Sequence, residues 1–355
     1  MPCPPAEEWK IFDKYACRVK DLHSADPEGA WVDGTRLIYP RLTALRARDG
    51  FDLFPNLRSI LCFLSEPGLH NKKLLPSNLR SLTSFVGNYG LDAGCHTNTL
   101  VQLASHTPFL EQLRLRGVFH FPITEQIRPL RLAYLQEVDL TRASISYRDF
   151  QYLCGVLCES PVATLSIHLR KPLAEWESAF PVFPVLRRLI FCGDPTMVQD
   201  FLGRLPRSTL ADLTIEHEDC RIELNTHVYE SLLDLLNERF SASLKSIHLN
   251  FGRQPMDVYR HYFIARTLMA LCPLVEVGLE ELRYSMSIVM SSLPKELQRA
   301  LDPSCWPTLR VFSFSTQTQT LYHRELEESM VLWGIHTSFM SVPVQSPARG
   351  TDLDD

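Results

Sequence analysis

The 355-residue sequence has little glycine and no long apolar run. Its 15 glycines form neither Gly-x-x-x-x-Gly-Lys-Ser/Thr nor Gly-x-Gly-x-x-Gly, so both glycine-rich phosphate-binding loops are missing. The richest apolar window, Tyr262 to Leu274, is interrupted by Arg266 and is shorter than the roughly 18 residues of a membrane-spanning helix. We therefore expect neither a phosphate loop nor a membrane-spanning segment.

The sequence also lacks an excess of basic residues. Lysine and arginine number 36 against 41 aspartates and glutamates, a net charge of -5, which argues against a dedicated nucleic-acid binder. The ten cysteines show no tight spacing, and the N-terminus lacks the basic and apolar regions of a secretion signal. These features predict a reducing compartment, cytoplasmic or nuclear, with most cysteines buried as small hydrophobic residues.

Metal-binding and catalytic patterns are missing as well. The nearest metal-ligand candidates are Cys154 with Cys158, the run from His217 to Cys220, and His96, and none has the paired spacing of a zinc site. No Gly-x-Ser-x-Gly elbow occurs, and no cysteine lies in a catalytic motif. We expect a protein that is not an enzyme and that uses no metal or other cofactor.

What the sequence does contain is a recurring phrase with apolar residues at +0, +3 and +5, often with proline two residues before the first. The copies begin at Leu42, Leu57, Leu79, Leu110, Leu135, Val162, Leu186, Leu210, Leu244, Leu274 and Leu309, with a weaker copy at Val19. In the eleven stronger copies every residue at +0, +3 and +5 except Ser84 is apolar, whereas few at +2, +4 and +6 are. This alternation is typical of a strand with one buried face.

The segments between the phrases have helical spacing, at residues 97–106, 146–158, 195–205, 226–240, 257–271 and 285–301. A strand, turn and helix repeating about every 25 residues is typical of the leucine-rich repeat. The sequence thus predicts an α/β leucine-rich-repeat solenoid, an irregular horseshoe with parallel strands on its concave face and helices on its convex face. We expect an N-terminal cap segment at 1–18, the solenoid at 19–338 and a disordered tail at 339–355.

Two of the phrases, Pro55-Asn56-Leu57-Arg58-Ser59-Ile60 and Pro76-Ser77-Asn78-Leu79-Arg80-Ser81-Leu82, resemble the repeats of fungal F-box leucine-rich-repeat proteins. The opening from Glu8 to Val19 is also similar to the start of their first strand. In that family an F-box precedes the repeats and docks a Skp-type adaptor of a cullin-RING ubiquitin ligase, while the repeats hold the substrate.

The resemblance therefore implies a ubiquitin ligase substrate receptor. Because no Leu-Pro-x-Glu opening precedes Val19, we expect the F-box to be missing. Two explanations stay open, namely a truncated F-box protein and a repeat-only relative. A Skp-type adaptor would be a partner only if an F-box were restored.

Side chains at +2, +4 and +6 should face solvent on the concave surface, so they are the candidate partner-binding residues. The candidates are Arg46, Arg48, Leu61, Phe63, Phe85, Arg114, Arg116, Glu137, Asp139, Asp212, Glu216, Glu276 and Glu280. Their order along the chain predicts a concave face that is basic near the N-terminus and acidic toward the C-terminus. The three apolar candidates add a patch beside the basic end.

Two interpretations of these residues stay open. They form a dipolar groove for a protein of opposite polarity, or the charges are scattered by chance and the N-terminal segment covers the apolar patch. The expected function is non-catalytic protein binding, resembling the substrate-recognition part of an F-box subunit. The alternative is a standalone leucine-rich-repeat scaffold or inhibitor with no ubiquitin-ligase role. RNA binding through the four arginines is a third, weaker hypothesis, because they are few.

Overall fold

All strand pairings in the described part of the chain are parallel. The structure, a computed structural model, describes residues 6–23, 52–63, 75–86, 103, 105–119, 130–169, 183–217, 226–253, 260–287, 295–315 and 336–338. The chain divides into two compact units. Unit 1 comprises Met1–Asp194 with Gly203–Thr209, and unit 2 comprises Pro195–Leu202 with Leu210–Asp355.

Unit 1 begins with a helix and continues as a parallel sheet. Its elements are α1 (Ala6–Ala16), β1 (Asp21–His23), β2 (Ser59–Phe63), β3 (Ser81–Val86), β4 (Gln112–Phe119), β5 (Glu137–Leu140), β6 (Ala143–Ile145), α4 (Tyr147–Leu157), β7 (Thr164–His168) and β8 (Arg188–Cys192). The strands are hydrogen-bonded in the order β1-β2-β3-β4-β5-β7-β8. The first half of β4 pairs with β5 and its second half with the short β6.

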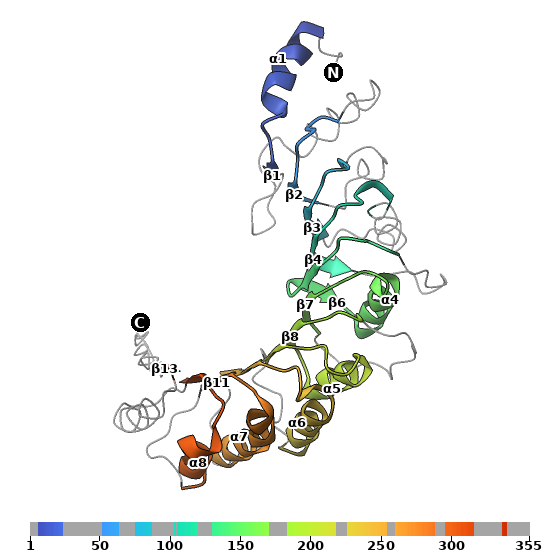
Figure 1. Cartoon of the computed structure of the whole chain (residues 1–355). Helices are drawn as coiled ribbons and strands as arrows, with labels where there is room; N and C mark the ends of the chain where they lie inside the picture. The colour runs from blue at the N-terminus through green and yellow to red at the C-terminus, as the bar shows by residue number, and fades with distance from the viewer. Residues whose placement is uncertain are drawn as a thin grey trace, which may run out of the picture. The chain divides into compact units, whose positions relative to one another are not determined.

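Unit 2 alternates strands with longer helices. Its elements are α5 (Pro195–Arg204, mostly within this unit), β9 (Asp212–Glu216), α6 (Thr226–Phe240), β10 (Ser246–Arg253), α7 (Arg260–Val277), β11 (Glu281–Ser287), α8 (Lys295–Ala300), the 3-10 helix η1 (Pro303–Cys305), β12 (Val311–Ser315) and β13 (His336–Ser338). The strand order is β9-β10-β11-β12-β13. Helices α6, α7 and α8 follow one another on the same side of the strands, each packed against the next (Figure 1).

The apolar positions of the phrases form the core, as the alternation predicts. In the phrase of β4, Leu110 and Leu113 are fully buried and Leu115 is 2% exposed, whereas Gln112 and Arg114 between them are only half-buried. The strands β5 and β9 show the same alternation of buried and half-buried residues. Burial of one side of each strand therefore holds the elements together.

The same hydrogen bonds recur at the start of successive strands. The backbone amide of Leu135, the first residue of its phrase, donates to the carbonyl of Leu132 at 3.1 Å and closes a turn. The next two amides, of Gln136 and Glu137, then donate to the single carbonyl of Glu111 on the preceding strand, at 2.9 and 3.0 Å. Pairs of amides bond to one carbonyl in the same way before β10, β11 and β12. This pattern aligns the phrases of neighbouring strands residue for residue.

Three predicted helices are confirmed closely, at 146–158, 195–205 and 226–240, where α4, α5 and α6 lie. The amide of Asp149 donates to the hydroxyl of Ser146 at 3.1 Å, which caps the start of α4. The two remaining helices predicted in unit 2, at 257–271 and 285–301, differ in extent from the observed elements. Helix α7 continues six residues beyond the predicted end at 271, and β11 extends to Ser287 within the segment 285–301, which was predicted to be helical.

The prediction of a strand starting at Leu274 is wrong, because this residue lies in α7. The helix includes Pro273 and ends at Gly278, which has a φ of 130° and donates its amide to the carbonyl of Leu274 at 3.2 Å. The phrase belonging to β11 starts instead at Leu279. Glycine suits this position because positive φ is strained for residues with a side chain.

The predicted α/β class with parallel strands is confirmed by these elements. The phrase at Leu42, most of the segment 97–106 and the tail at 339–355 lie outside the described residues. None of the helices in the described ranges has the combined length and apolar character needed to cross a membrane.

Candidate partner-binding strand face

The candidate site consists of the side chains at +2, +4 and +6 of the phrases, which we call the strand face. In unit 1 the +4 residues of neighbouring strands lie in register, so Thr83, Arg114 and Asp139 form a row across β3, β4 and β5. Leu61 on β2 lies at the same level as Thr83 and is half-buried. The parallel register thus brings together residues that are 22 to 31 positions apart in the sequence.

An ion pair joins two of the predicted site residues of unit 1. The Nη2 of Arg114 lies 3.1 Å from Oε1 of Glu137, and the two side chains are 36% and 30% exposed. The neighbouring carboxylate of Asp139 accepts hydrogen bonds from the amide and hydroxyl of Thr141, at 3.0 and 2.7 Å. Basic and acidic candidates that the sequence assigned to opposite ends of the face are therefore side by side on β4 and β5.

Arg116 is the remaining basic candidate within the described residues of this face. Partial burial lowers the pKa of its guanidinium, Arg142 and Arg114 lower it further, and Asp139 raises it. Charges of both signs therefore act on this guanidinium, and Arg114 is itself paired with Glu137.

The strand face of unit 2 has a different composition. Asp212 and Glu216 are half-buried on β9, and neither forms an ion pair with another described residue. On β11, the Nε of Arg283 donates to the carboxylate of Glu281. His248 on β10 lies in register with Arg283. Among the described residues, the face of unit 2 therefore combines the unpaired acids of β9 with a paired arginine and a histidine.

His248 has a perturbed titration. Burial lowers its pKa, the nearby charge of Arg283 lowers it further, and Glu281 raises it. The neutral imidazole that results can both donate and accept a hydrogen bond.

The predicted site residues thus have different outcomes. Arg46 and Arg48 lie outside the described residues, as do the side chains of Phe63 and Phe85, whose backbones belong to β2 and β3. The placement of Glu276 on the strand face is wrong, because this residue is exposed on helix α7. The remaining candidates except Glu280 are half-buried on β2, β4, β5 and β9.

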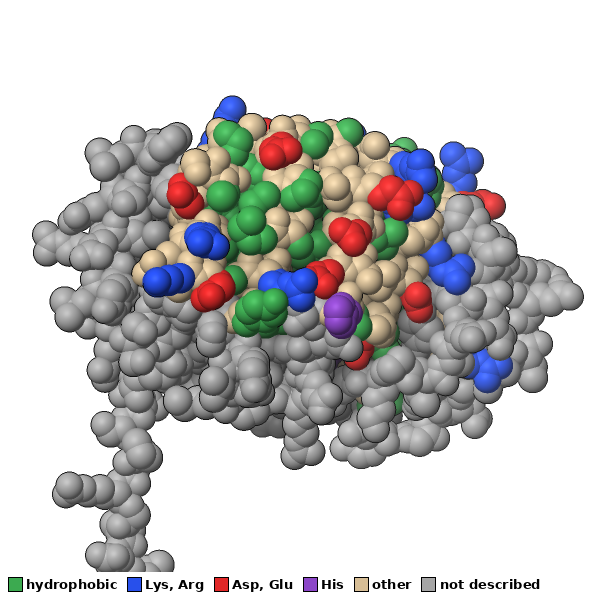
Figure 2. Space-filling view, turned by 90° about the horizontal axis from the view of Figure 1, so that it is seen from below, with side chains coloured by type: hydrophobic (Ala, Val, Ile, Leu, Met, Phe, Trp, Pro, Cys, Tyr) green, Lys and Arg blue, Asp and Glu red, His purple; other side chains and the backbone are tan. Residues whose placement is uncertain are grey.

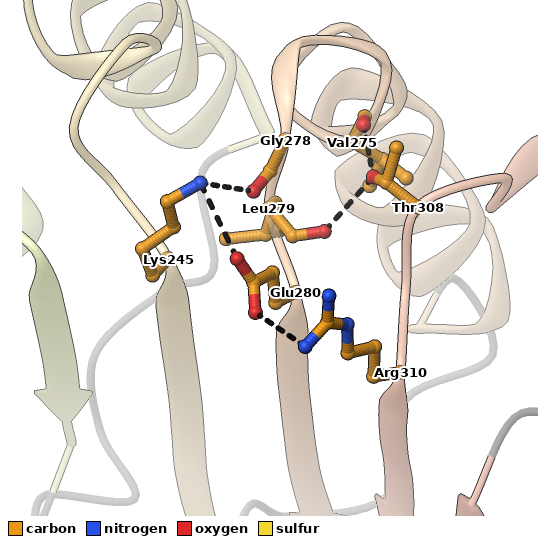
Figure 3. A network of polar contacts seen from close by, with 7 residues as sticks. All are labelled: Lys245, Val275, Gly278, Leu279, Glu280, Thr308 and Arg310. Atoms are coloured by element: carbon orange, nitrogen blue, oxygen red, sulfur yellow. Dashed lines mark hydrogen bonds and ion pairs between the residues drawn. The ribbon is translucent and has the colours of Figure 1, made fainter.

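The placement of Glu280 on the strand face is also wrong, because it occupies the turn before β11. Its Oε1 lies 3.4 Å from Nζ of Lys245, and its Oε2 lies 3.5 Å from Nη1 of Arg310 (Figure 3). The same lysine donates to the carbonyl of Gly278 at 3.1 Å. Glu280 therefore links the starts of three neighbouring strands.

Glu281 and Arg283 were not among the predicted site residues, because the predicted phrase starts five residues before the observed one. Leu279, Leu282 and Tyr284 satisfy the same +0, +3 and +5 spacing, and all three are buried. The glycine directly before this phrase was the signal that could have corrected it, since glycine commonly follows the last turn of a helix.

Charges of both signs are mixed on the part of the surface that Figure 2 shows. Figure 2 shows a face on which Lys and Arg side chains lie among Asp and Glu side chains, with hydrophobic side chains between them. Within the described ranges, no three His, Cys, Asp or Glu side chains are close enough to hold a metal ion. Cys154 is buried in α4, which raises the pKa of its thiol well above the ordinary value.

Neither a family model nor a curated protein sequence matches this chain.

Proposed function

We propose that this chain is a non-catalytic protein-binding protein built as a leucine-rich-repeat solenoid, with the strand face as its concave, partner-binding surface. The observation that carries the proposal is the recurring hydrogen-bond pattern at the strand starts. Because it aligns the phrases, it displays the +2 and +4 side chains as regular rows on parallel strands. Such rows are what repeat proteins use to bind extended partner surfaces.

The residues of the strand face support a protein partner. They include arginines, carboxylates, a histidine and a half-buried leucine, a mixture suited to ion pairs and hydrogen bonds around apolar contacts. The resemblance of the repeat phrases to those of fungal F-box proteins supports a finer proposal, in which the partner is a substrate presented for ubiquitination. A standalone scaffold would use the same face without an adaptor.

The test is affinity capture from cell extract with the purified chain as bait, read by quantitative mass spectrometry. The variant Arg114→Glu with Arg116→Glu reverses the charge of the strand face of unit 1. The matched control reverses Arg131 and Arg148, which are exposed outside the strand face. We expect specific partners to bind wild type and control and to be lost from the strand-face variant.

The captured proteins also separate the two finer functions. A Skp-type adaptor among them supports the ubiquitin-ligase role, whereas partners captured without an adaptor, also by a bait with an F-box restored before the repeats, support the standalone scaffold. Identical proteins captured by all three baits would contradict the use of the unit 1 strand face.

A further inference from the structure

The turns before the strands of unit 1 place a basic row and an apolar row along one edge of its sheet, which we call the turn edge. The basic row consists of Lys20, Arg58 and Arg80, each directly after the first residue of its phrase. The apolar row consists of residues directly before the first phrase residue, chiefly Phe109, Tyr134 and Val185. Neither row belongs to the strand face.

The members of the basic row directly precede three consecutive strands, β1, β2 and β3, and all three are exposed. The amide of Arg58 donates to the carbonyl of Lys20 at 2.7 Å, and that of Arg80 to the carbonyl of Arg58 at 2.8 Å. Their backbones are therefore separated by about one strand spacing, roughly 4.8 Å. Arg80 pairs with Glu111, but neither Lys20 nor Arg58 pairs with an acidic side chain in the described part of the chain.

The equivalent positions in unit 2 show how such a row is neutralised within a chain. There Lys245, Glu280 and Arg310 alternate in charge, and the glutamate bridges its two neighbours at 3.4 and 3.5 Å (Figure 3). Like charges on adjacent strands are destabilising, and unit 1 has no acid among its first three positions. The basic row is thus ready to bind an acidic group supplied by another molecule.

The apolar row continues the turn edge along the next strands. Phe109, Tyr134 and Val185 are 41%, 50% and 43% exposed, which makes them three of the large hydrophobic residues that the described surface leaves open. The rings of Phe109 and Tyr134 contact each other, with centroids 5.5 Å apart and planes at 45°. Pro161 occupies the equivalent turn between Tyr134 and Val185. Exposed aromatic residues beside arginines are typical anchors of protein interfaces.

We propose that the turn edge of unit 1 binds an amphipathic, acidic helical segment of another protein, with its acids on the basic row and its apolar residues on the apolar row. Successive turns of a helix are 5.4 Å apart, close to the strand spacing, so residues at i, i+4 and i+7 meet successive turns of the edge. Side chains on the same face of an extended chain are about 6.6 Å apart, which does not match the spacing of the strands along the turn edge.

The length of the edge agrees with such a partner. Six strand spacings separate Lys20, directly before β1, from Val185, before β8. They amount to about 29 Å, which is the length of a helix of about 20 residues. Single-stranded RNA is the less favoured occupant. The carboxylate of Glu111 separates the basic row from the aromatic pair, and the two rings already contact each other instead of leaving room for a base.

The experiment uses fluorescein-labelled synthetic helices of about 20 residues and the full chain. The probe has glutamates on one face of its first half and leucines on the same face of its second half. Probes with the two halves exchanged and with a scrambled order of the same residues accompany it. Binding is measured by fluorescence anisotropy. The variants are Lys20→Glu with Arg58→Glu and Phe109→Ser with Tyr134→Ser, each checked for native thermal unfolding.

We expect one of the two ordered helices to bind, and both variants to weaken it about tenfold or more. The strand-face variant Arg114→Glu with Arg116→Glu should bind it like wild type, so the turn edge and the proposed function are tested separately. Equal binding of the scrambled probe, no binding of any probe, or equal binding by the variants would overturn the proposal. So would tight binding of an oligouridylate that the same variants abolish.

Discussion

The guanidinium of Arg114 and the carboxylate of Glu137 form an ion pair 3.1 Å long between neighbouring strands of unit 1. Both side chains remain about one third exposed, so solvent screens much of their attraction. Replacing either by glutamine should lower the free energy of unfolding by less than about 1 kcal/mol. A double-mutant cycle measured by urea denaturation checks this, and a coupling energy well above that limit would contradict it.

Leu113 and Gln112 are adjacent on β4 but face opposite sides of the sheet. Leu113 is fully buried, so Leu113→Ala should leave a cavity and cost about 2 to 5 kcal/mol. Gln112 is on the half-buried strand face, and Gln112→Ala should change stability by less than about 0.5 kcal/mol. Urea denaturation of the two variants provides the comparison, and equal losses would show that the strand register is wrong.

Two glycines should respond to alanine in opposite directions. A Cβ at Gly193 would lie 2.7 Å from the backbone oxygen of Leu169, so Gly193→Ala should cost about 1 to 3 kcal/mol. A Cβ at Gly203 in α5 meets no atom within 4 Å, so Gly203→Ala should gain about 0.5 to 1 kcal/mol. Thermal unfolding of both variants tests the prediction, which fails if the two shifts have the same sign.

His248 should titrate below the ordinary histidine pKa, because burial and Arg283 disfavour its charged form. Arg283→Gln should raise the pKa and Glu281→Gln should lower it further, as NMR titration of the imidazole can show.

The lowered pKa of His248 should also make the free energy of unfolding depend on pH. Because the folded-state pKa lies below that of the unfolded chain, the unfolded chain binds the proton more readily. The free energy of unfolding should therefore decrease as the pH falls from about 7 toward about 5.5. His248→Gln should remove part of this decrease, and an unchanged pH dependence in that variant would count against the prediction.

Cys272 should be a slow nucleophile. Burial is the main cause and the neighbouring Cys305 the second cause that raise the pKa of its thiol to about 11. Little thiolate therefore forms at about pH 8. The exposed Cys17 should then react with iodoacetamide first, and labelling of Cys272 should accelerate as the pH approaches 11. Peptide mass spectrometry at several pH values measures both rates. Equal rates near neutral pH would refute the expectation.

Local patterns determined much of the fold. The spacing of Leu110, Leu113 and Leu115 identified β4 and its buried side, because a strand sends alternate side chains to opposite faces whatever its neighbours are. The helix predicted at residues 226–240 coincides with α6 for a similar reason, since its apolar residues recur at helical spacing. The polar residues of the strand face in unit 1 followed directly from the same alternation.

Tertiary structure decided the choice between two phrases that fit equally well, one starting at Leu274 and one at Leu279. Only the second places two amides, of Glu280 and Glu281, against the carbonyl of Lys245, and only then can residues 260–277 continue as a helix packed between α6 and α8. The spacing of apolar residues alone does not make this choice, because the carbonyl belongs to Lys245, 35 residues before Glu280.

The tertiary structure also decided which charged side chains form ion pairs. For the described strands other than β11, the sequence by itself determined which side of the sheet each residue faces, because that depends on the period of a single strand. The pairing of Arg114 with Glu137, and the lack of an ion pair for Lys20 and Arg58 in the described chain, depend on which strands become neighbours and in which register. Those contacts arise only when backbone hydrogen bonds align one strand with the next.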